Sequence, residues 1–204
     1  MKSLFILAVL AIVMVGATQS SYADPVVFTA NLTGAAESPP NASPGTGFAT
    51  VTYDSVTHML RVQVTFSGLT AGNTAAHIHC CTASPGTGVA GEATMFPTFT
   101  GFPGGTSGTY DHTFDLTLAS SWNPVFIAVN GGTTASAEAV FAAGLFNGMT
   151  YLNIHSSTFP GGEIRGFLVQ AVPEPATMLL LSTGLAGVAL RLRRRRKAIK
   201  SEET

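Results

Sequence analysis

The sequence predicts an all-β fold, an immunoglobulin-like or Greek-key β-sandwich with one short helix, flanked by an N-terminal signal helix and a C-terminal transmembrane helix. In the middle of the chain, apolar and polar residues alternate over short runs, which is typical of half-buried strands. Turn-forming residues, among them many of the 22 Gly and 11 Pro, separate these runs, as they do in sandwiches and barrels. Longer apolar runs lie near the two ends, at residues 4–15 and 176–190.

Residues 1–23 have the three parts of a secretory signal peptide. Lys2 supplies a positive charge, residues 4–15 form the apolar run, and Ser21 and Ala23 are small residues at the −3 and −1 positions of a cleavage site. This apolar run is too short for a membrane span, which needs about 20 residues. We therefore expect cleavage between Ala23 and Asp24, so that the mature chain begins at Asp24 and is exported.

Eight strands and one helix are predicted between the two ends. The strands are expected at residues 26–32, 48–53, 59–66, 74–80, 108–118, 125–129, 151–154 and 164–169. The second and third are joined through residues 54–57, which is typical of a hairpin. The helix is expected at residues 136–146, because Thr133 and Thr134 precede it and Asn147 and Gly148 follow it. Together these elements form one domain at residues 24–171.

The charges of this domain exclude several classes of function. Residues 24–170 hold two basic residues, Arg61 and Arg165, against eight Asp and Glu, which leaves a net charge of about −6. Binding to a phosphate backbone needs clustered cations, and Schiff-base chemistry needs a lysine, which this segment lacks. Residues 86–91 match the G-x-G-x-x-G pattern of dinucleotide-binding proteins, but no helix is predicted directly after them. We expect no nucleic acid and no nucleotide as partners.

Two of the five histidines form the most informative pair. His77 and His79 are two residues apart in a predicted strand, so both rings point to one side of it while Ala76 and Ile78 point to the other. Imidazoles placed side by side are suited to bind a metal such as copper or zinc. The alternative is a structural role, in which the rings hydrogen-bond to loops and to residues 163–165.

The other histidines and the last strand have simpler interpretations. His58 lies beside a hairpin turn and is expected in solvent, whereas His112 shares a strand face with apolar residues and is expected in the core. Glu163 and Arg165 are two residues apart on a strand and therefore share a face. We expect an ion pair between them that holds the last strand to the sandwich, with recognition of a ligand or partner as the alternative.

Cys80 and Cys81 have several possible states. Export favours oxidised cysteines, and a disulfide between the two neighbours is one interpretation. Cys81 would point to the same side as His79 if the strand continued, which makes metal ligation a second. An intermolecular disulfide and two free thiols are the remaining alternatives.

Three segments resemble the motifs of the CHRD domain, named from chordin, in the same order along the chain. They are residues 28–37 (FTANLTGAAE), residues 68–79 (GLTAGNTAAHIH) and residues 151–166, which include YLNIH and PGGEIRG. The resemblance spans about residues 26–170. It implies an immunoglobulin-like β-sandwich for which no enzymatic activity is established.

The strand with His77 and His79 also resembles the copper-ligand strand of copper-zinc superoxide dismutases. In that family a further histidine on a late strand completes the copper site, and His155 is the matching residue here. The long loop with the bridging and zinc ligands, and its cysteine pair, have no equivalent between residues 81 and 108. The resemblance implies a copper or zinc site at His77, His79 and His155 without dismutase activity.

The C-terminal residues resemble the PEP-CTERM sorting signal of exported bacterial proteins. Its three parts are Val172-Pro173-Glu174-Pro175, the apolar run at residues 176–190 and the Arg-rich residues 191–197. The resemblance covers residues 172–197 and implies a transmembrane helix at residues 176–190 with a cytoplasmic tail at residues 198–204. It also implies recognition by an exosortase-type membrane protease.

These observations predict an exported, non-enzymatic binding or structural protein. The C-terminal helix holds it at the inner membrane, and sorting then releases it to the cell envelope or to an exopolysaccharide matrix. The expected partners are the protease and either exopolysaccharide or envelope proteins, and this function needs no cofactor. The alternative function is a copper- or zinc-binding metalloprotein that uses His77, His79 and His155 and is similar to a degenerate copper-zinc superoxide dismutase.

Overall fold

The computed structural model describes residues 25–171 and Gly184, and the fold is that of residues 25–171. The predicted signal peptide, with its cleavage point between Ala23 and Asp24, lies outside the described residues. The sorting motif at residues 172–175 and the predicted cytoplasmic tail lie outside them too, as does the apolar run between them except for Gly184. Among the described residues, no helix combines the length and apolar character that a membrane crossing needs.

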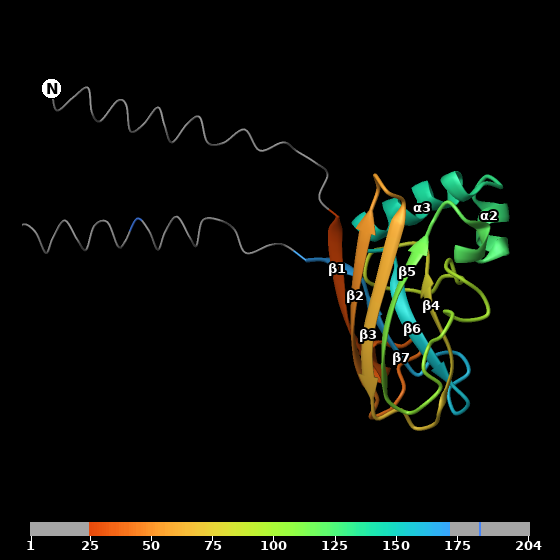
Figure 1. Ribbon diagram of the computed structural model, residues 1–204. Coiled ribbons are helices and arrows are strands. Elements are labelled where there is room, and N and C mark those ends of the chain that lie inside the picture. The colour runs from red at the N-terminus through yellow and green to blue at the C-terminus, as the bar shows by residue number, and fades with distance from the viewer. Residues whose placement is uncertain (1–24, 172–183, 185–204) are drawn as a thin grey trace, which may run out of the picture. The chain divides into compact units, whose positions relative to one another are not determined.

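Within the described residues, eight strands form one antiparallel sheet (Figure 1). The order along the sheet is β4-β6-β7-β1-β2-β3-β5, and β8 pairs with β1. The strands are β1 (Val26–Thr33), β2 (Thr46–Asp54), β3 (Met59–Ser67), β4 (Asn73–His79), β5 (Gly108–Asp115), β6 (Tyr151–Ser156), β7 (Ile164–Phe167) and β8 (Val169–Gln170). Of the eight predicted strands, only the one at residues 125–129 adopts another structure.

The sheet curls at β1 and encloses the core between two layers. β1 pairs with β2 over its full length, but with β7 only at Thr33 and Arg165. Side chains in β2 and β3 alternate between more and less buried positions. The buried ones, such as Val62, share one hydrophobic core with Ile78 and Ile154 of the β4-β6 layer. This arrangement confirms the predicted all-β sandwich.

β4 and β6 differ from the other long strands because both of their faces are buried. The last four residues of β4 and all six residues of β6 are buried. β4 is an edge strand of the sheet, and the chain that follows it returns along this edge. The N–H groups of Ala93 and Phe99 donate to the carbonyl oxygens of Ile78 and Ala76 at 2.9 and 3.1 Å. Segments between the strands therefore bury the outer face of these two strands.

The helix α3 (Thr134–Phe146) confirms the predicted helix and starts two residues earlier. Its N-cap is Thr133, whose hydroxyl accepts from the N–H of Ser136 while the hydroxyl of Ser136 accepts from the N–H of Thr133. This reciprocal capping box satisfies two backbone donors that the first turn leaves free. Two short 3-10 helices, η1 (Gly34–Ala36) and η2 (Ala119–Ser121), lie in connecting segments.

The helix α2 (Pro124–Val129) corrects the prediction of a strand at residues 125–129. The side chain of Asn123 accepts a hydrogen bond from the N–H of Val125 at 2.9 Å, and Pro124 occupies the first turn. Both residues favour the start of a helix, and they outweigh the β-branched composition of the run. The described residues therefore contain two α-helices where the sequence predicts one.

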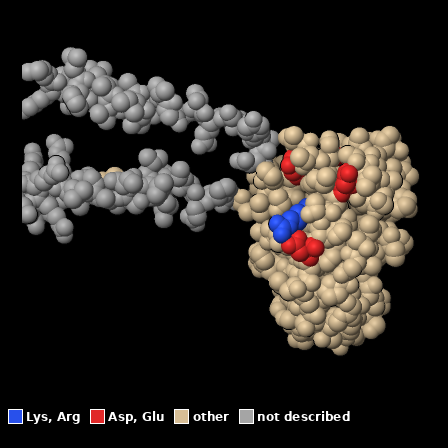
Figure 2. Space-filling view, in the orientation of Figure 1, with Lys and Arg blue, Asp and Glu red and all other residues tan. Residues whose placement is uncertain are grey.

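Charged side chains are sparse on this domain. On the face shown in Figure 2, uncharged residues predominate, one basic group lies beside an acidic group, and other acidic groups lie apart from them. The two cations of residues 25–171 are both paired, Arg61 with Asp111 at 2.6 Å and Arg165 with Glu37 at 3.7 Å. No other Lys or Arg occurs in this range, so the remaining acids have no cationic side chain of the domain to pair with.

Candidate metal centre

Three histidines meet on the outer face of β4 and β6. Ala76 and Ile78 belong to the hydrophobic core, so His77 and His79 point to the opposite face, as the period of two predicts. His155 lies on β6, one diagonal step from His77 in the register of the two strands. The ring centroids are between 5.3 and 5.9 Å apart, and at most 8% of any of the three residues is exposed.

Each imidazole is held by the backbone of a loop. The bonds join His77 Nε2 to Pro97 O at 2.5 Å, His79 Nδ1 to Ala90 O at 2.9 Å and His155 Nδ1 to Pro160 O at 3.0 Å. A carbonyl oxygen only accepts, so the ring nitrogen that faces it carries the hydrogen. The three bonds therefore fix both the tautomer and the orientation of each ring.

The other nitrogen of each ring is buried and has no hydrogen-bond partner among the described residues. These atoms are His77 Nδ1, His79 Nε2 and His155 Nε2. In the neutral tautomer each one carries a lone pair. Burying such an acceptor without a partner costs about 1–3 kcal/mol, and most buried polar atoms avoid this cost by finding a partner. A cluster of three is therefore difficult to explain by a purely structural role.

The spacing of the rings fits a single metal ion. One nitrogen of each histidine lies within 4.8 Å of a nitrogen of the other two. The centre of an equilateral triangle with that side is about 2.8 Å from each corner, whereas metal–imidazole bonds measure about 2.0–2.1 Å. An inward shift of about 0.7 Å by each ring therefore brings the three nitrogens to bonding distance.

Burial keeps these rings neutral near pH 7. It is the largest influence on all three histidines, and it lowers the pKa of His77 and His155 and brings that of His79 down to about 4. A neutral imidazole is the form that binds a metal. The three side chains are therefore in the protonation state that ligation requires.

Two aromatic rings enclose the histidines. Tyr151 stacks flat on His79 with a centroid distance of 4.7 Å, and Phe96 lies over His77 at 6.3 Å. Phe96 is 57% exposed, so His77 lies just beneath a surface side chain. Sequence reasoning did not single out either aromatic residue. The period of two places Tyr151 on the same face as His155, whereas no pattern marks Phe96, which lies in a loop.

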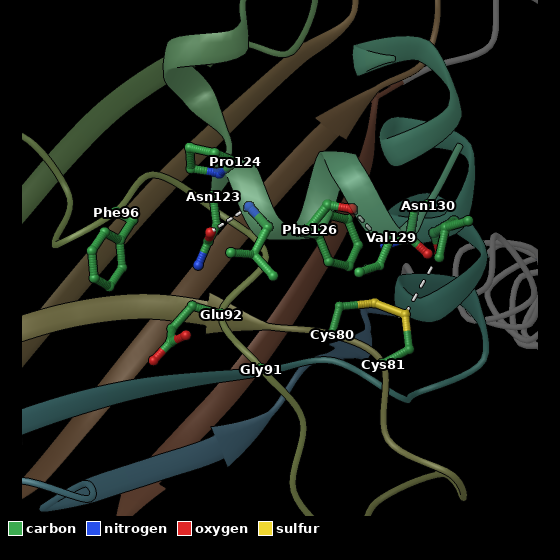
Figure 3. A pocket seen from close by; sticks show the side chains of 12 residues that line it. Cys80, Cys81, Gly91, Glu92, Phe96, Asn123, Pro124, Phe126, Val129 and Asn130 are labelled. Atoms are coloured by element: carbon green, nitrogen blue, oxygen red, sulfur yellow. Dashed lines mark hydrogen bonds between the residues drawn. A yellow bond between two sulfur atoms is a disulfide. The ribbon is translucent and has the colours of Figure 1, made fainter. Parts of the chain in front are cut away.

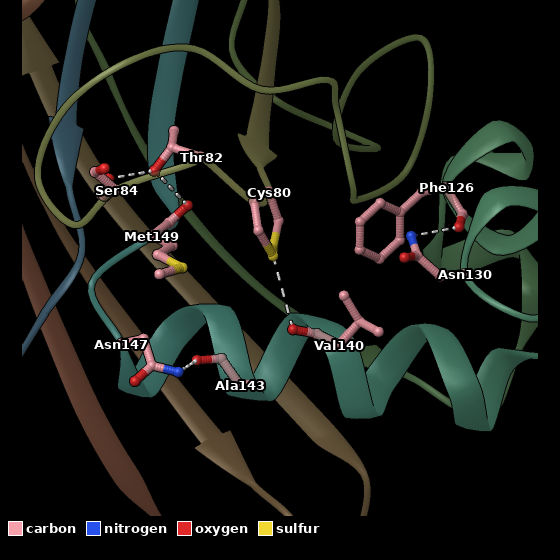
Figure 4. Close-up of a disulfide and its surroundings, with 10 residues drawn as sticks. Cys80, Thr82, Ser84, Phe126, Asn130, Val140, Ala143, Asn147 and Met149 are labelled. Carbon is pink, nitrogen blue, oxygen red and sulfur yellow. Dashed lines mark hydrogen bonds between the residues drawn. A yellow bond between two sulfur atoms is a disulfide. The ribbon is translucent and has the colours of Figure 1, made fainter.

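Cys80 and Cys81 form a disulfide with each other, which makes the alternatives of metal ligation, an intermolecular bridge and free thiols wrong. β4 ends at His79, so the strand does not carry Cys81 onto the histidine face. The disulfide lines a groove of about 740 Å³ between residues 91–96 and α2 (Figure 3). The sulfur of Cys81 lies 3.7 Å from the carbonyl oxygen of Val140 on α3. Figure 4 shows the helix beside Cys80.

The predicted ion pair between Glu163 and Arg165 is wrong. Arg165 pairs with Glu37, while Glu163 accepts hydrogen bonds from the hydroxyl of Ser43 and the N–H of Thr70, each at 2.6 Å. Glu163 precedes β7, which begins at the next residue, so the strand geometry that would align the two side chains does not apply. Both residues still tie this end of the sheet to neighbouring loops.

His58 and His112 lie outside the cluster. The expectation of a solvated His58 is confirmed, because the residue is exposed, and its ring also hydrogen-bonds to Glu138 of α3 at 2.9 Å. His112 is half-buried, and its ring lies against Phe114 at a centroid distance of 4.6 Å. Neither ring contributes to the centre formed by the other three histidines.

The C-terminal signal is identified by comparison with family models. Residues 171–195 match the PEP-CTERM protein-sorting motif, as the sequence predicts. This motif directs export and C-terminal membrane anchoring, and it is processed by an exosortase-type membrane enzyme. The protein is therefore sorted toward the cell envelope or the outside of the cell.

The globular part also matches a family model. The model of the CHRD domain covers residues 28–168, well over half of the chain and all three histidines of the centre. Neither matched family is known as a family of enzymes. No curated protein and no solved structure matches the chain. On the strength of the domain match and of the β-sandwich that it spans, the chain belongs to the CHRD domain family.

Proposed function

We propose that this protein is a non-enzymatic module of the cell envelope or the exopolysaccharide matrix that holds one copper or zinc ion on His77, His79 and His155. One observation carries the proposal, namely that three buried histidines, each with one unpartnered ring nitrogen, have ligand atoms within 4.8 Å of one another. An ion bound there satisfies all three lone pairs at once and removes the free-energy cost of burying them.

The chemistry of the donors favours copper or zinc. Imidazole nitrogen is a common ligand of both metals, whereas magnesium and calcium prefer oxygen. Ligating histidines usually donate their second N–H to a carbonyl or carboxylate, which fixes the ring and makes it a stronger ligand. The carbonyls of Ala90, Pro97 and Pro160 have this arrangement.

Sorting and surface composition support the envelope or matrix role. The PEP-CTERM motif sends the chain in that direction. The domain has few charged side chains and an acidic balance, so its surface suits neutral polysaccharide better than anionic polymers. Neither family match points to a substrate or a reaction, which supports a binding role over a catalytic one.

The metal content of the exported chain tests this function. The full-length protein, expressed for export without a histidine tag and purified in detergent, is analysed for copper and zinc by elemental mass spectrometry. We expect near-stoichiometric metal in the unaltered chain and almost none in the double variant His77→Ala/His79→Ala, because two of the three ligands are lost. His112→Ala, which removes a histidine outside the cluster, serves as the matched control and retains the metal. A chain that takes up neither ion after incubation with both contradicts the proposal.

A further inference from the structure

An acidic residue lies beside the histidine cluster, on the segment that returns along the edge of β4. Glu92 forms an antiparallel bridge with His79. The bridge is flanked by hydrogen bonds from Cys80 N–H to Gly91 O at 3.1 Å and from Ala93 N–H to Ile78 O at 2.9 Å. Residues directly opposite each other in such a bridge project to the same face, with Cβ atoms about 4.5–5.5 Å apart. The side chain of Glu92 therefore starts from the face that carries the histidines.

Glu92 stands opposite His79, and its side chain starts on the face that carries all three rings. The three histidines already have ligand atoms within 4.8 Å of one another, whereas the carboxylate of Glu92 is not part of that group. The side chain of Glu92 therefore has to turn toward the ring nitrogens to reach an ion held between them.

Glu92 has no cationic partner in the domain. The ion pairs of the described residues use the carboxylates of Glu138, Asp111 and Glu37. Glu92 is partly exposed and lines the groove beside Phe96, the residue that covers His77 (Figure 3). No Lys or Arg lines this groove. A carboxylate at the junction of groove and histidine cluster is therefore left uncompensated.

We propose that Glu92 supplies the fourth protein ligand of the metal centre through a carboxylate oxygen. This inference rests on the proposed function, because it concerns the same ion. Carboxylate oxygen binds zinc at about 2.0–2.2 Å, and four protein ligands are typical of structural sites, whereas catalytic sites keep a position open. A centre of three histidines and one glutamate also agrees with a non-enzymatic role.

Substitution of Glu92 by Gln tests the ligand in the full-length chain. The substitution keeps the size of the side chain and removes its charge, and it affects a partly exposed residue outside every ion pair. The probes are Co²⁺, whose visible absorption reports the number and type of ligands, and Zn²⁺, whose affinity is measured by competition with a chelator. We expect a changed Co²⁺ spectrum and at least a tenfold weaker Zn²⁺ affinity. Asp54→Asn, which removes a partly exposed carboxylate at the turn between β2 and β3, should match the unaltered chain in both.

The outcomes separate this inference from the proposed function. A Glu92→Gln chain with an unchanged Co²⁺ spectrum overturns the ligand assignment, even if its Zn²⁺ affinity falls, because a carboxylate that acts only by its charge leaves the coordination intact. In that case the difference in Zn²⁺ affinity between the variant and the unaltered chain should disappear in high salt, because salt screens the charge of a carboxylate that does not touch the ion. An unaltered chain that binds none of Co²⁺, Zn²⁺ and copper refutes the centre itself, and the fourth ligand with it.

Discussion

At the three histidines, burial and backbone hydrogen bonds act together. The carbonyl bonds decide which nitrogen of each ring keeps its lone pair, and burial keeps the ring neutral so that the lone pair is available. Both effects have a consequence for the metal-free protein. Without an ion, three buried acceptors stay unsatisfied and any protonation of the cluster favours the unfolded chain.

We therefore expect the metal-free protein to lose stability as the pH falls from about 6.5 to 4. A histidine in the unfolded chain has a pKa of about 6.5, whereas burial lowers that of His79 to about 4. The unfolded state then binds more protons in this window, so the free energy of unfolding falls with decreasing pH, by about 3 kcal/mol for His79 alone. Urea unfolding in the presence of a chelator, at pH values near both ends of the window, measures this change.

The variant His79→Gln assigns the effect to one residue. Its free energy of unfolding should depend less on pH than that of the unaltered chain, while His112→Gln should keep the full dependence. An identical pH profile for His79→Gln and the unaltered protein would show that His79 titrates normally in the folded state.

The sequence predicts part of this site, and the physical reasons are local. His77 and His79 share a face because the backbone of any strand alternates, so the pair is predictable without knowing the fold. Their meeting with His155 depends on the pairing of β4 with β6, and only the family resemblance pointed to it. The carbonyl groups that hold the rings, and Glu92, lie in the segments that connect the strands. No sequence pattern predicts the path of these segments.

At the level of elements, α3 packs closely against the disulfide at Gly144. A Cβ atom at Gly144 would lie 2.6 Å from the sulfur atoms of both Cys80 and Cys81 and 3.1 Å from Thr150. Ala usually stabilises a helix relative to Gly by about 0.5–1 kcal/mol. Here we expect the contact with the disulfide to reverse the sign, because Cys80 is buried, Cys81 is partly buried and the two are bonded to each other.

Gly144→Ala is expected to destabilise the protein by about 1–3 kcal/mol, the range for overpacked cores. The midpoint of urea unfolding measures the change. Gly104→Ala is the matched control, since a Cβ atom there meets nothing within 4 Å, and its effect should stay within about 0.5 kcal/mol. A Gly144→Ala variant as stable as the control would mean that α3 moves away from the disulfide without cost.

In α2, two sequence patterns predict different structures for the same residues. Residues 125–129 have the apolar, β-branched composition of a strand, yet Asn123 and Pro124 start a helix there. The cap and the fixed φ of proline favour the first turn of a helix. The run of five residues is apolar throughout, so it lacks the alternation of apolar and polar residues that would favour a strand. Where strands are longer, as in β2 and β3, alternation predicts both their existence and their buried faces.

For the molecule as a whole, the sorting motif determines the destination of the domain. In the native host, a chain with Pro173→Ala and Pro175→Ala should keep its C-terminal segment and stay in the membrane fraction, because the processing enzyme no longer recognises the motif. The mass of the chain in membrane and extracellular fractions measures this. Glu202→Gln, a change outside the matched residues, should be processed normally. Release of the proline variant at the usual rate would contradict recognition through these residues.

The segment that follows β4 also protects the protein against its own copies. β4 is the last strand at one side of the sheet, and an uncovered edge strand is a template for pairing with another chain. The hydrogen bonds from Ala93 and Phe99 occupy that edge, and the same segment carries the carbonyls that hold His77 and His79. Detachment of this segment would thus disturb the proposed metal ligands and expose the edge of β4 to other chains at the same time, so the protein that loses the proposed ion by this route would also be more prone to aggregate.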